Sequence, residues 1–392
     1  MTDSTSKAAH VHLSEERQSQ TKTVSPPTIL RDAAHLAGVS FNGDQPWDIQ
    51  VFDSRVYRRI LTHGSLGFGE SYMDNMWECH ELDELFHRLL KVDIEKHLGS
   101  VAKFRLYFEI IRQNLFNRQT SKRAYEVGKK HYDTGNDIFQ AMLDPTMSYS
   151  CGYWANADTL AQAQIGKLDL ICRKLMLERV LEIGCGWGSF AQYAAQNYGV
   201  EVYGITISKE QQILAQERCA GLPVTIELMD YRDLEGQFDK IVSIGMFEHV
   251  GPKNYPVYFD SAMKLLKPEG LFLLHTIGIH ATSLKVDPWI DKYIFRNGKL
   301  PSAEELASVI NGRFVIEDWH NFGTDYDKTL MAWWENFDKA WPELSTHYDE
   351  RFYRMWKYYL HSCAGFFRSK QGQLWQLVLS KHGRDGEYLS LR

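Results

Sequence analysis

The 392-residue sequence lacks several features that mark particular classes of protein. It has no run of eighteen apolar residues, so we expect no segment that spans a membrane. Its polar N-terminus is unlike a signal peptide, so export is not expected either. The six cysteines are scattered, with no C-x-x-C pair, which argues against both a zinc site and a disulfide framework. We therefore predict no metal ligands and a cytoplasmic, reducing location.

A basic excess is also missing, because the net charge is −6. A surface that follows nucleic-acid phosphates needs such an excess, so we expect no nucleic acid as a partner. The charge is unevenly placed, however: the segment from Lys91 to Lys130 carries ten Lys or Arg against four Asp or Glu. This segment fits an anionic surface such as lipid headgroups, and equally a solvated helix face.

What is present is an ordinary globular composition, with 44% hydrophobic and 24% charged residues, enough for two cores. We expect four parts: a disordered tail over residues 1–27, a small, mainly helical domain over 28–116, a polar linker over 117–130 and a larger domain over 131–392. Within 101–115, apolar residues recur at helical spacing beside Lys and Arg. Such a helix packs on its own domain or lies on a membrane, and the pattern alone favours packing.

The small domain shows short elements. Helical patterns span Ile29–Ala37 and Val56–Leu61, and Trp47–Phe52 reads as a strand. The glycines of Gly64–Tyr72 predict a loop, and Trp77–Leu90 then resumes helical spacing.

The stretch Arg179–Gly188 organises the larger domain. An apolar run with strand propensity meets Gly184, Gly186 and Gly188, and a helical pattern starts at Ser189, which predicts a strand, a tight turn and a helix. Free amides at that helix start would favour the anionic end of a ligand. The spacing is G-x-G-x-G, unlike the dinucleotide fingerprint, and a purely structural turn would look similar.

A second strand, Glu201–Ile205, ends without the acidic residue that commonly binds a ribose in nucleotide-binding sheets. The Thr206 and Ser208 hydroxyls, together with Gln211 or Gln212, would have to share that role. Ser208 and Gln211 also have the spacing of a helix capping box, which is expected with or without a ligand.

Further strands predict a parallel, doubly wound α/β sheet of the Rossmann-like kind. They are Val224–Leu228, Phe238–Ile244 and Leu271–Thr276; beyond this sheet pattern, Phe314–Asp318 and Leu374–Ser380 also read as strands. Because ligands bind where such strands end, the pairs Asp230-Tyr231, Glu248-His249 and His275-Thr276 should face one crevice. Two aromatic-rich helices, Asp327–Trp341 and Asp349–Arg368, supply core or the wall of a channel.

Five motifs of the larger domain, VLEIGCGWG, TISKEQ, MFEHVG, LLHTIG and DYDKTLMAW, resemble those of the cyclopropane-fatty-acyl-phospholipid synthases. The resemblance covers about Pro46 to Ser380. It departs from the family at Glu182, where aspartate is usual, in the loop before Val180, which lacks Pro-Gly, and in the first thirty or so residues. It implies a class I S-adenosylmethionine (SAM) methyltransferase fold, with residues 28–116 as a domain that binds lipid or membrane and 131–392 as the catalytic domain.

The family's reaction implies that the SAM methyl is transferred to the cis double bond of an unsaturated phospholipid acyl chain, and that a bound bicarbonate then accepts a proton as the ring closes. The positions that match its bicarbonate site are Cys151, Glu248, His275, Ile277 through its backbone, and Tyr326. Each also has a structural interpretation, as a core residue or a loop salt bridge. Cys363 matches a suspected nucleophile, although methylation of an alkene requires no thiol.

The resemblance also assigns the cofactor contacts. Tyr149 and Ser150 would cover the methionine end above Gly184, Gly186 and Gly188; the ribose would meet Thr206, Ser208 and Gln211; the adenine would lie between Asp230 and Tyr231. It further implies a homodimer, peripherally bound to the inner face of a membrane. Two alternatives remain open: a methyltransferase that leaves a methyl branch or alkylates a small molecule, and a lipid-binding module without turnover.

Overall fold

The computed structural model describes residues 24–92, 135–283 and 286–392. Most of the predicted tail, the predicted helix within 101–115, the linker over 117–130 and the domain boundaries near 116 and 131 lie outside these residues.

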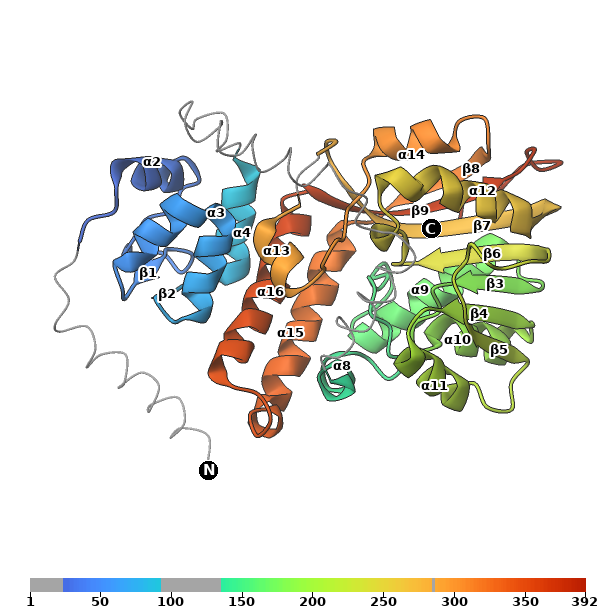
Figure 1. Ribbon diagram of the computed structural model, residues 1–392, viewed down its shortest axis with the longest axis horizontal. Coiled ribbons are helices and arrows are strands. Elements are labelled where there is room, and N and C mark those ends of the chain that lie inside the picture. The colour runs from blue at the N-terminus through green and yellow to red at the C-terminus, as the bar shows by residue number, and fades with distance from the viewer. Residues whose placement is uncertain (1–23, 93–134, 284–285) are drawn as a thin grey trace.

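A seven-stranded sheet forms one end of the molecule, with the order β5-β4-β3-β6-β7-β9-β8 (Figure 1). Its strands are β3 (Val180–Ile183), β4 (Val202–Thr206), β5 (Val224–Leu228), β6 (Phe238–Ile244), β7 (Leu266–Ile279), β8 (Val315–Asn321) and β9 (Gly372–Ser380). The first five run parallel, and β9 is antiparallel to both β7 and β8. The predicted α/β class and the seven predicted strands are confirmed.

Helices cover both faces of this sheet, and the alternation along β7 shows why. Leu271 and Leu273 join a core with α9 (Leu160–Leu175) and α10 (Ser189–Tyr198), whereas Phe272 and Leu274 join a core with α12 (Tyr255–Leu265) and α14 (Ala303–Ile310). Successive strand residues point to opposite faces, so a continuous apolar run serves two cores. The remaining elements around the sheet are α8 (Asn136–Met142), α11 (Lys209–Arg218) and the 3₁₀ turns η1 (Phe247–His249) and η2 (Pro252–Asn254).

The N-terminal part comprises α2 (Thr28–Leu36), β1 (Gln50–Val51), α3 (Arg55–Met73), β2 (Trp77–Glu78) and α4 (Leu82–Lys91). The predicted strand at Trp47–Phe52 is thus only two residues long, and the predicted helix at Trp77–Leu90 begins with a strand pair and turns helical only at Leu82.

The loop predicted for Gly64–Tyr72 is wrong, because α3 continues through it with a break at Gly64, whose φ is 56°. The next two glycines serve packing rather than turning. A Cβ at Gly67 would lie 2.2 Å from the carbonyl oxygen of Arg59, and one at Gly69 would lie 2.4 Å from the Trp289 ring. Glycine here permits close approach within a helix.

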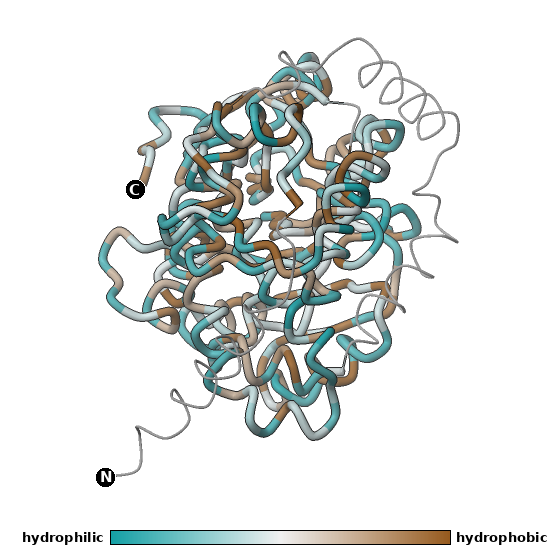
Figure 2. Tube along the Cα trace, turned by 90° about the vertical axis from the view of Figure 1, so that its left-hand side faces the viewer, coloured by the Kyte–Doolittle hydropathy of each residue, from teal (hydrophilic) through white to brown (hydrophobic). Residues whose placement is uncertain are grey.

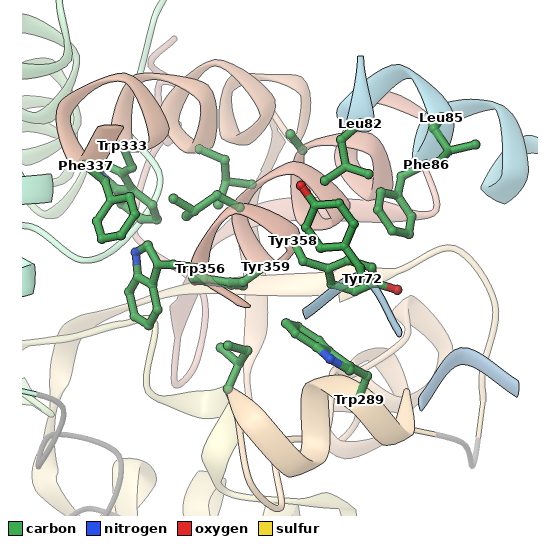
Figure 3. Close-up of a cluster of buried hydrophobic side chains, with 14 of the residues drawn as sticks. Tyr72, Leu82, Leu85, Phe86, Trp289, Trp333, Phe337, Trp356, Tyr358 and Tyr359 are labelled. Atoms are coloured by element: carbon green, nitrogen blue, oxygen red, sulfur yellow. The ribbon is translucent and has the colours of Figure 1, made fainter. Parts of the chain in front are cut away.

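Three helices lie between the N-terminal helices and the sheet: α13 (Pro288–Tyr293), α15 (Thr324–Leu344) and α16 (Glu350–Arg368) (Figure 1). One continuous apolar cluster joins them to α3 and α4. Figure 3 shows Tyr358 and Tyr359 of α16 with Leu82 and Phe86 of α4 on one side and Trp333 of α15 on the other. Apolar segments run through the middle of the molecule and polar ones over many outer turns (Figure 2).

Among the described residues, no helix combines the length and apolar character that crossing a membrane requires.

Candidate active site

A cavity of about 930 Å³ opens at the carboxyl ends of β3, β4 and β6 and continues toward α3, α4, α13 and α16. One part is lined by the glycine turn and by the residues that end neighbouring strands. The other is apolar and includes Phe68, Phe86, Leu89 and Leu90 from the N-terminal helices. A polar cleft and an apolar channel therefore form one space.

The glycine turn has the predicted backbone. Gly184, Gly186 and Gly188 have φ values of 81°, 54° and 82°, which disfavour side chains. The amides of Gly184 and Cys185 both donate to the carbonyl of Ile205, and that of Gly188 donates to the carbonyl of Cys185. These three amides stabilise the turn itself, which leaves fewer of its donors for a ligand.

At the end of β4, Thr206, Ser208 and Gln211 are buried and line the cavity. The Ser208 hydroxyl accepts from the Gln211 amide at 3.3 Å, which confirms a helix cap. The capping box is incomplete, because the Gln211 side chain bonds to the Thr206 hydroxyl at 2.9 Å instead of reaching back to Ser208.

At the end of β5, Asp230 and Tyr231 also line the cavity. Asp230 accepts two hydrogen bonds from the Arg232 guanidinium, so its charge is already paired. The Tyr231 ring packs edge-on against Tyr258, with 5.2 Å between ring centroids. Contacts with an adenine remain a prediction for both.

Tyr149 and Ser150 lie on the wall opposite, on the irregular segment that follows α8. The Tyr149 hydroxyl pairs with that of Tyr359 at 2.8 Å. The Ser150 hydroxyl accepts from the ammonium of Lys167 at 2.9 Å. Lys167 and Glu182 are buried and line the cavity, yet nothing in the sequence distinguishes Lys167 from the other lysine of the same helix.

Glu248 follows β6 on η1 and is 7% exposed. Its Oε1 accepts from the Ile277 amide at 2.7 Å, whereas its Oε2 is buried without a partner. Burial raises the pKa of this carboxyl to about 7. The Ile277 amide, which was predicted to bind the bicarbonate, thus already donates its hydrogen bond to Glu248.

His275, on β7, is 1% exposed, and its Nδ1 lies 3.3 Å from the amide nitrogen of Gln376. Its Nε2 is buried without a partner. Burial, aided by the charges of Lys167 and Lys174, holds the pKa of this imidazole well below its usual range, so the ring is neutral.

Cys151 is fully buried, 3.9 Å from the Thr329 hydroxyl, and burial raises the pKa of its thiol. Of the five predicted bicarbonate residues, Glu248, Ile277 and Tyr326 line the cavity, whereas Cys151 and His275 lie behind its surface.

Tyr326 stacks on Phe367 with 4.4 Å between ring centroids. Burial raises the pKa of its hydroxyl, and nearby acidic groups, including Cys151 and Glu248, raise it further. The hydroxyl is therefore a proton donor in the same polar region. Cys363 lines the cavity, but burial raises the pKa of its thiol to about 12, which opposes a nucleophilic thiolate.

Comparisons with known proteins identify the family and the fold. Residues 119–377 match the family described as mycolic acid cyclopropane synthetase. The chain is 57% identical over 361 residues to the cyclopropane-fatty-acyl-phospholipid synthase of Escherichia coli K12, covering 91% of this chain and 94% of that protein. It is 35% identical over 351 residues to the tuberculostearic acid methyltransferase UfaA1 of Mycobacterium tuberculosis, covering 83% and 81%. The crystal structure of mycolic acid cyclopropane synthase CmaA1 with SAH and CTAB matches with a TM-score of 0.61 and 33% identity, over 66% of this chain and 98% of that one.

Proposed function

The chain belongs to the mycolic acid cyclopropane synthetase family, and we propose that it transfers the methyl group of SAM to the cis double bond of an unsaturated phospholipid acyl chain and closes a cyclopropane ring. The observation that carries this proposal is the single cavity of about 930 Å³ that joins the glycine turn to an apolar channel, with Glu248 on its wall. A methyl donor and a hydrocarbon chain would therefore meet in one enclosed space.

SAM, when bound, supplies a methyl group on a sulfonium that is already strongly electrophilic. The residues then have to orient the donor and the alkene in line and exclude water. The glycine turn, Ser150 and the Thr206 side chain would hold the donor. Phe68 and Phe86, from the N-terminal helices, would exclude water along the chain.

Bicarbonate, when bound, would supply the proton acceptor for ring closure. Two orphaned polar atoms fit such a small oxyanion: Oε2 of Glu248 and Nε2 of His275, both buried without a partner. Neutral His275 and the Tyr326 hydroxyl can donate to an oxyanion, and Glu248 can do so while it is protonated. These residues would hold the anion and take the proton onward.

The test of the proposed function uses vesicles and labelled SAM. Incubation with unsaturated phospholipid is expected to add the mass of one methylene per acyl chain and to remove the double bond, while saturated vesicles stay unlabelled. Mass spectrometry of the released acyl chains measures both. A methyl branch would support simple methyl transfer, the reaction type given in the name of the UfaA1 relative. No label would support a lipid-binding module.

The apparent affinity for bicarbonate is expected to depend on pH. Protonated Glu248 can donate to the anion, whereas the carboxylate repels it. Because the pKa of Glu248 is about 7, affinity should fall by up to about tenfold per pH unit above that value. The rate at fixed bicarbonate-ion concentrations between pH 6.5 and 8.5 measures it. The KM for SAM serves as the control, and a bicarbonate affinity that is flat over this range contradicts the assignment.

Access to a phospholipid further suggests peripheral association with the inner face of a membrane, and a homodimer that grips one bilayer patch with two lipid-binding regions.

A further inference from the structure

A buried lysine lies at the wall of the cavity without a carboxylate partner. Lys167, in α9, is 1% exposed, and its ammonium donates to the Ser150 hydroxyl. No other hydrogen bond from this ammonium occurs among the described residues, although a lysine has three donors. A buried charge is costly unless it is paired, so this arrangement needs a partner.

The position of Lys167 relates it to the glycine turn. Its ammonium is 2.9 Å from Ser150, and the Cβ of Ser150 is 3.8 Å from where a Cβ on Gly245 would lie. The next residue, Met246, lies 2.7 Å from where a Cβ on Gly184 would be. Contacts through Ser150 and then Met246 thus link Lys167 to the turn, and Lys167 lines the same cavity.

A second buried polar group lines the same cavity. Glu182, at the end of β3, is 3% exposed, and its Oε2 is buried without a partner. Burial raises the pKa of the Glu182 carboxyl well above its usual range, and the nearby charge of Lys167 only partly offsets this. An unfilled donor of Lys167 and an unpartnered acceptor of Glu182 therefore line one cavity.

The other cations that line the cavity are engaged elsewhere or exposed. Arg232 is paired with Asp230, Lys299 donates to the carbonyl of Ser283, and Arg296 is exposed to solvent. Because three amides of the glycine turn already bond within the protein, a carboxylate bound there needs another donor.

We propose that Lys167 binds the carboxylate of the amino-acid end of the cofactor, in the part of the cavity that the glycine turn lines. This inference rests on the proposed use of SAM and adds a binding residue to it. The ammonium of Lys167 bonds to one carboxylate oxygen while it also holds Ser150 in place, and the acceptor of Glu182 remains for the cofactor's own ammonium. At neutral pH Lys167 is mostly charged, since burial lowers its pKa only to about 8.

The test compares ligands that differ only at the amino-acid end, using the full chain and isothermal titration calorimetry at pH 7. Lys167→Met is expected to weaken S-adenosylhomocysteine binding roughly 10- to 100-fold, the loss of one charge-assisted hydrogen bond. Binding of 5′-methylthioadenosine, which has no amino-acid end, and of decarboxylated S-adenosylhomocysteine, which keeps only the ammonium, should change by less than about threefold.

Lys174→Met is the matched control. Lys174 lies on the same helix, is also fully buried and has a pKa lowered to about 8, but it pairs with Asp318 and does not line the cavity. Its loss should lower thermal stability and leave the affinity for S-adenosylhomocysteine unchanged.

Lys167→Gln, which keeps a donor for Ser150, should reproduce the selective loss if Lys167→Met does not fold. Equal weakening of all three ligands, or unchanged S-adenosylhomocysteine binding, would overturn the assignment. Failure of the wild-type protein to bind S-adenosylhomocysteine would instead count against the proposed function.

Discussion

Replacing Glu248 by glutamine is expected to lower kcat for ring formation by roughly 100-fold or more, the usual contribution of a positioned acid or base. The amide keeps the size of the side chain, and its oxygen can still accept from the Ile277 amide at the 2.7 Å contact. What it loses is the ability to take up or release a proton at the orphaned position. Turnover on unsaturated vesicles and S-adenosylhomocysteine affinity are the two measurements, and only the first should change.

A second variant tests whether the base site, meaning the residues that would hold the bicarbonate, includes His275 behind the cavity wall. His275→Ala removes the other orphaned atom and is expected to slow turnover greatly with little effect on cofactor binding. Glu305→Gln is a suitable control, because Glu305 caps α14 away from the cavity lining. Wild-type turnover in both Glu248→Gln and His275→Ala would remove the base site from the mechanism.

The sheet could be predicted from the sequence because its signals are local. Each strand is a short apolar run, and the glycine turn between β3 and α10 is fixed by three residues with positive φ. The rule that ligands bind where parallel strands end then places Thr206, Asp230 and Glu248 on one cavity.

The N-terminal elements were harder to predict because their glycines respond to distant partners. Gly69 lies in a helix and leaves room for the Trp289 ring, which comes from α13, more than two hundred residues later. A glycine-rich stretch that reads as a loop can therefore be a helix that another element approaches closely. No local pattern carries that information.

The candidate site likewise combines residues that the sequence could locate with residues that it could not. The rule that ligands bind where parallel strands end located Glu248. The burial of Cys151 and His275 behind the cavity wall instead depends on their neighbours Thr329 and Gln376, which come from later elements. Lys167 is one of two lysines on α9, and its hydrogen bond to Ser150 and its place on the cavity wall distinguish it from Lys174. Tertiary contacts, rather than residue spacing, decide these positions.

Arg354→Met is expected to lower the free energy of unfolding by about 3–5 kcal/mol, the cost of leaving the partners of a buried charge unpaired. Arg354, on α16, is 7% exposed and donates to the carbonyls of Tyr72 and Trp77 and to the carboxylate of Glu78. Its guanidinium also lies 4.0 Å from the centre of the Tyr72 ring. Chemical denaturation measures the change.

The functional consequence follows from what Arg354 holds in place. Tyr72 and Glu78 belong to the N-terminal part whose Phe68 and Phe86 wall the apolar channel, so loosening it should reduce turnover on vesicles. Cofactor affinity should persist, because the hydrogen bonds that hold the glycine turn come from β4 and from the turn itself and do not involve Arg354. Arg351→Met is the matched control: Arg351 lies on the same helix, is 45% exposed and pairs with Asp74 at the surface, where such a pair contributes about 0–1 kcal/mol. If both variants keep wild-type stability and turnover, the channel wall does not depend on this buried arginine.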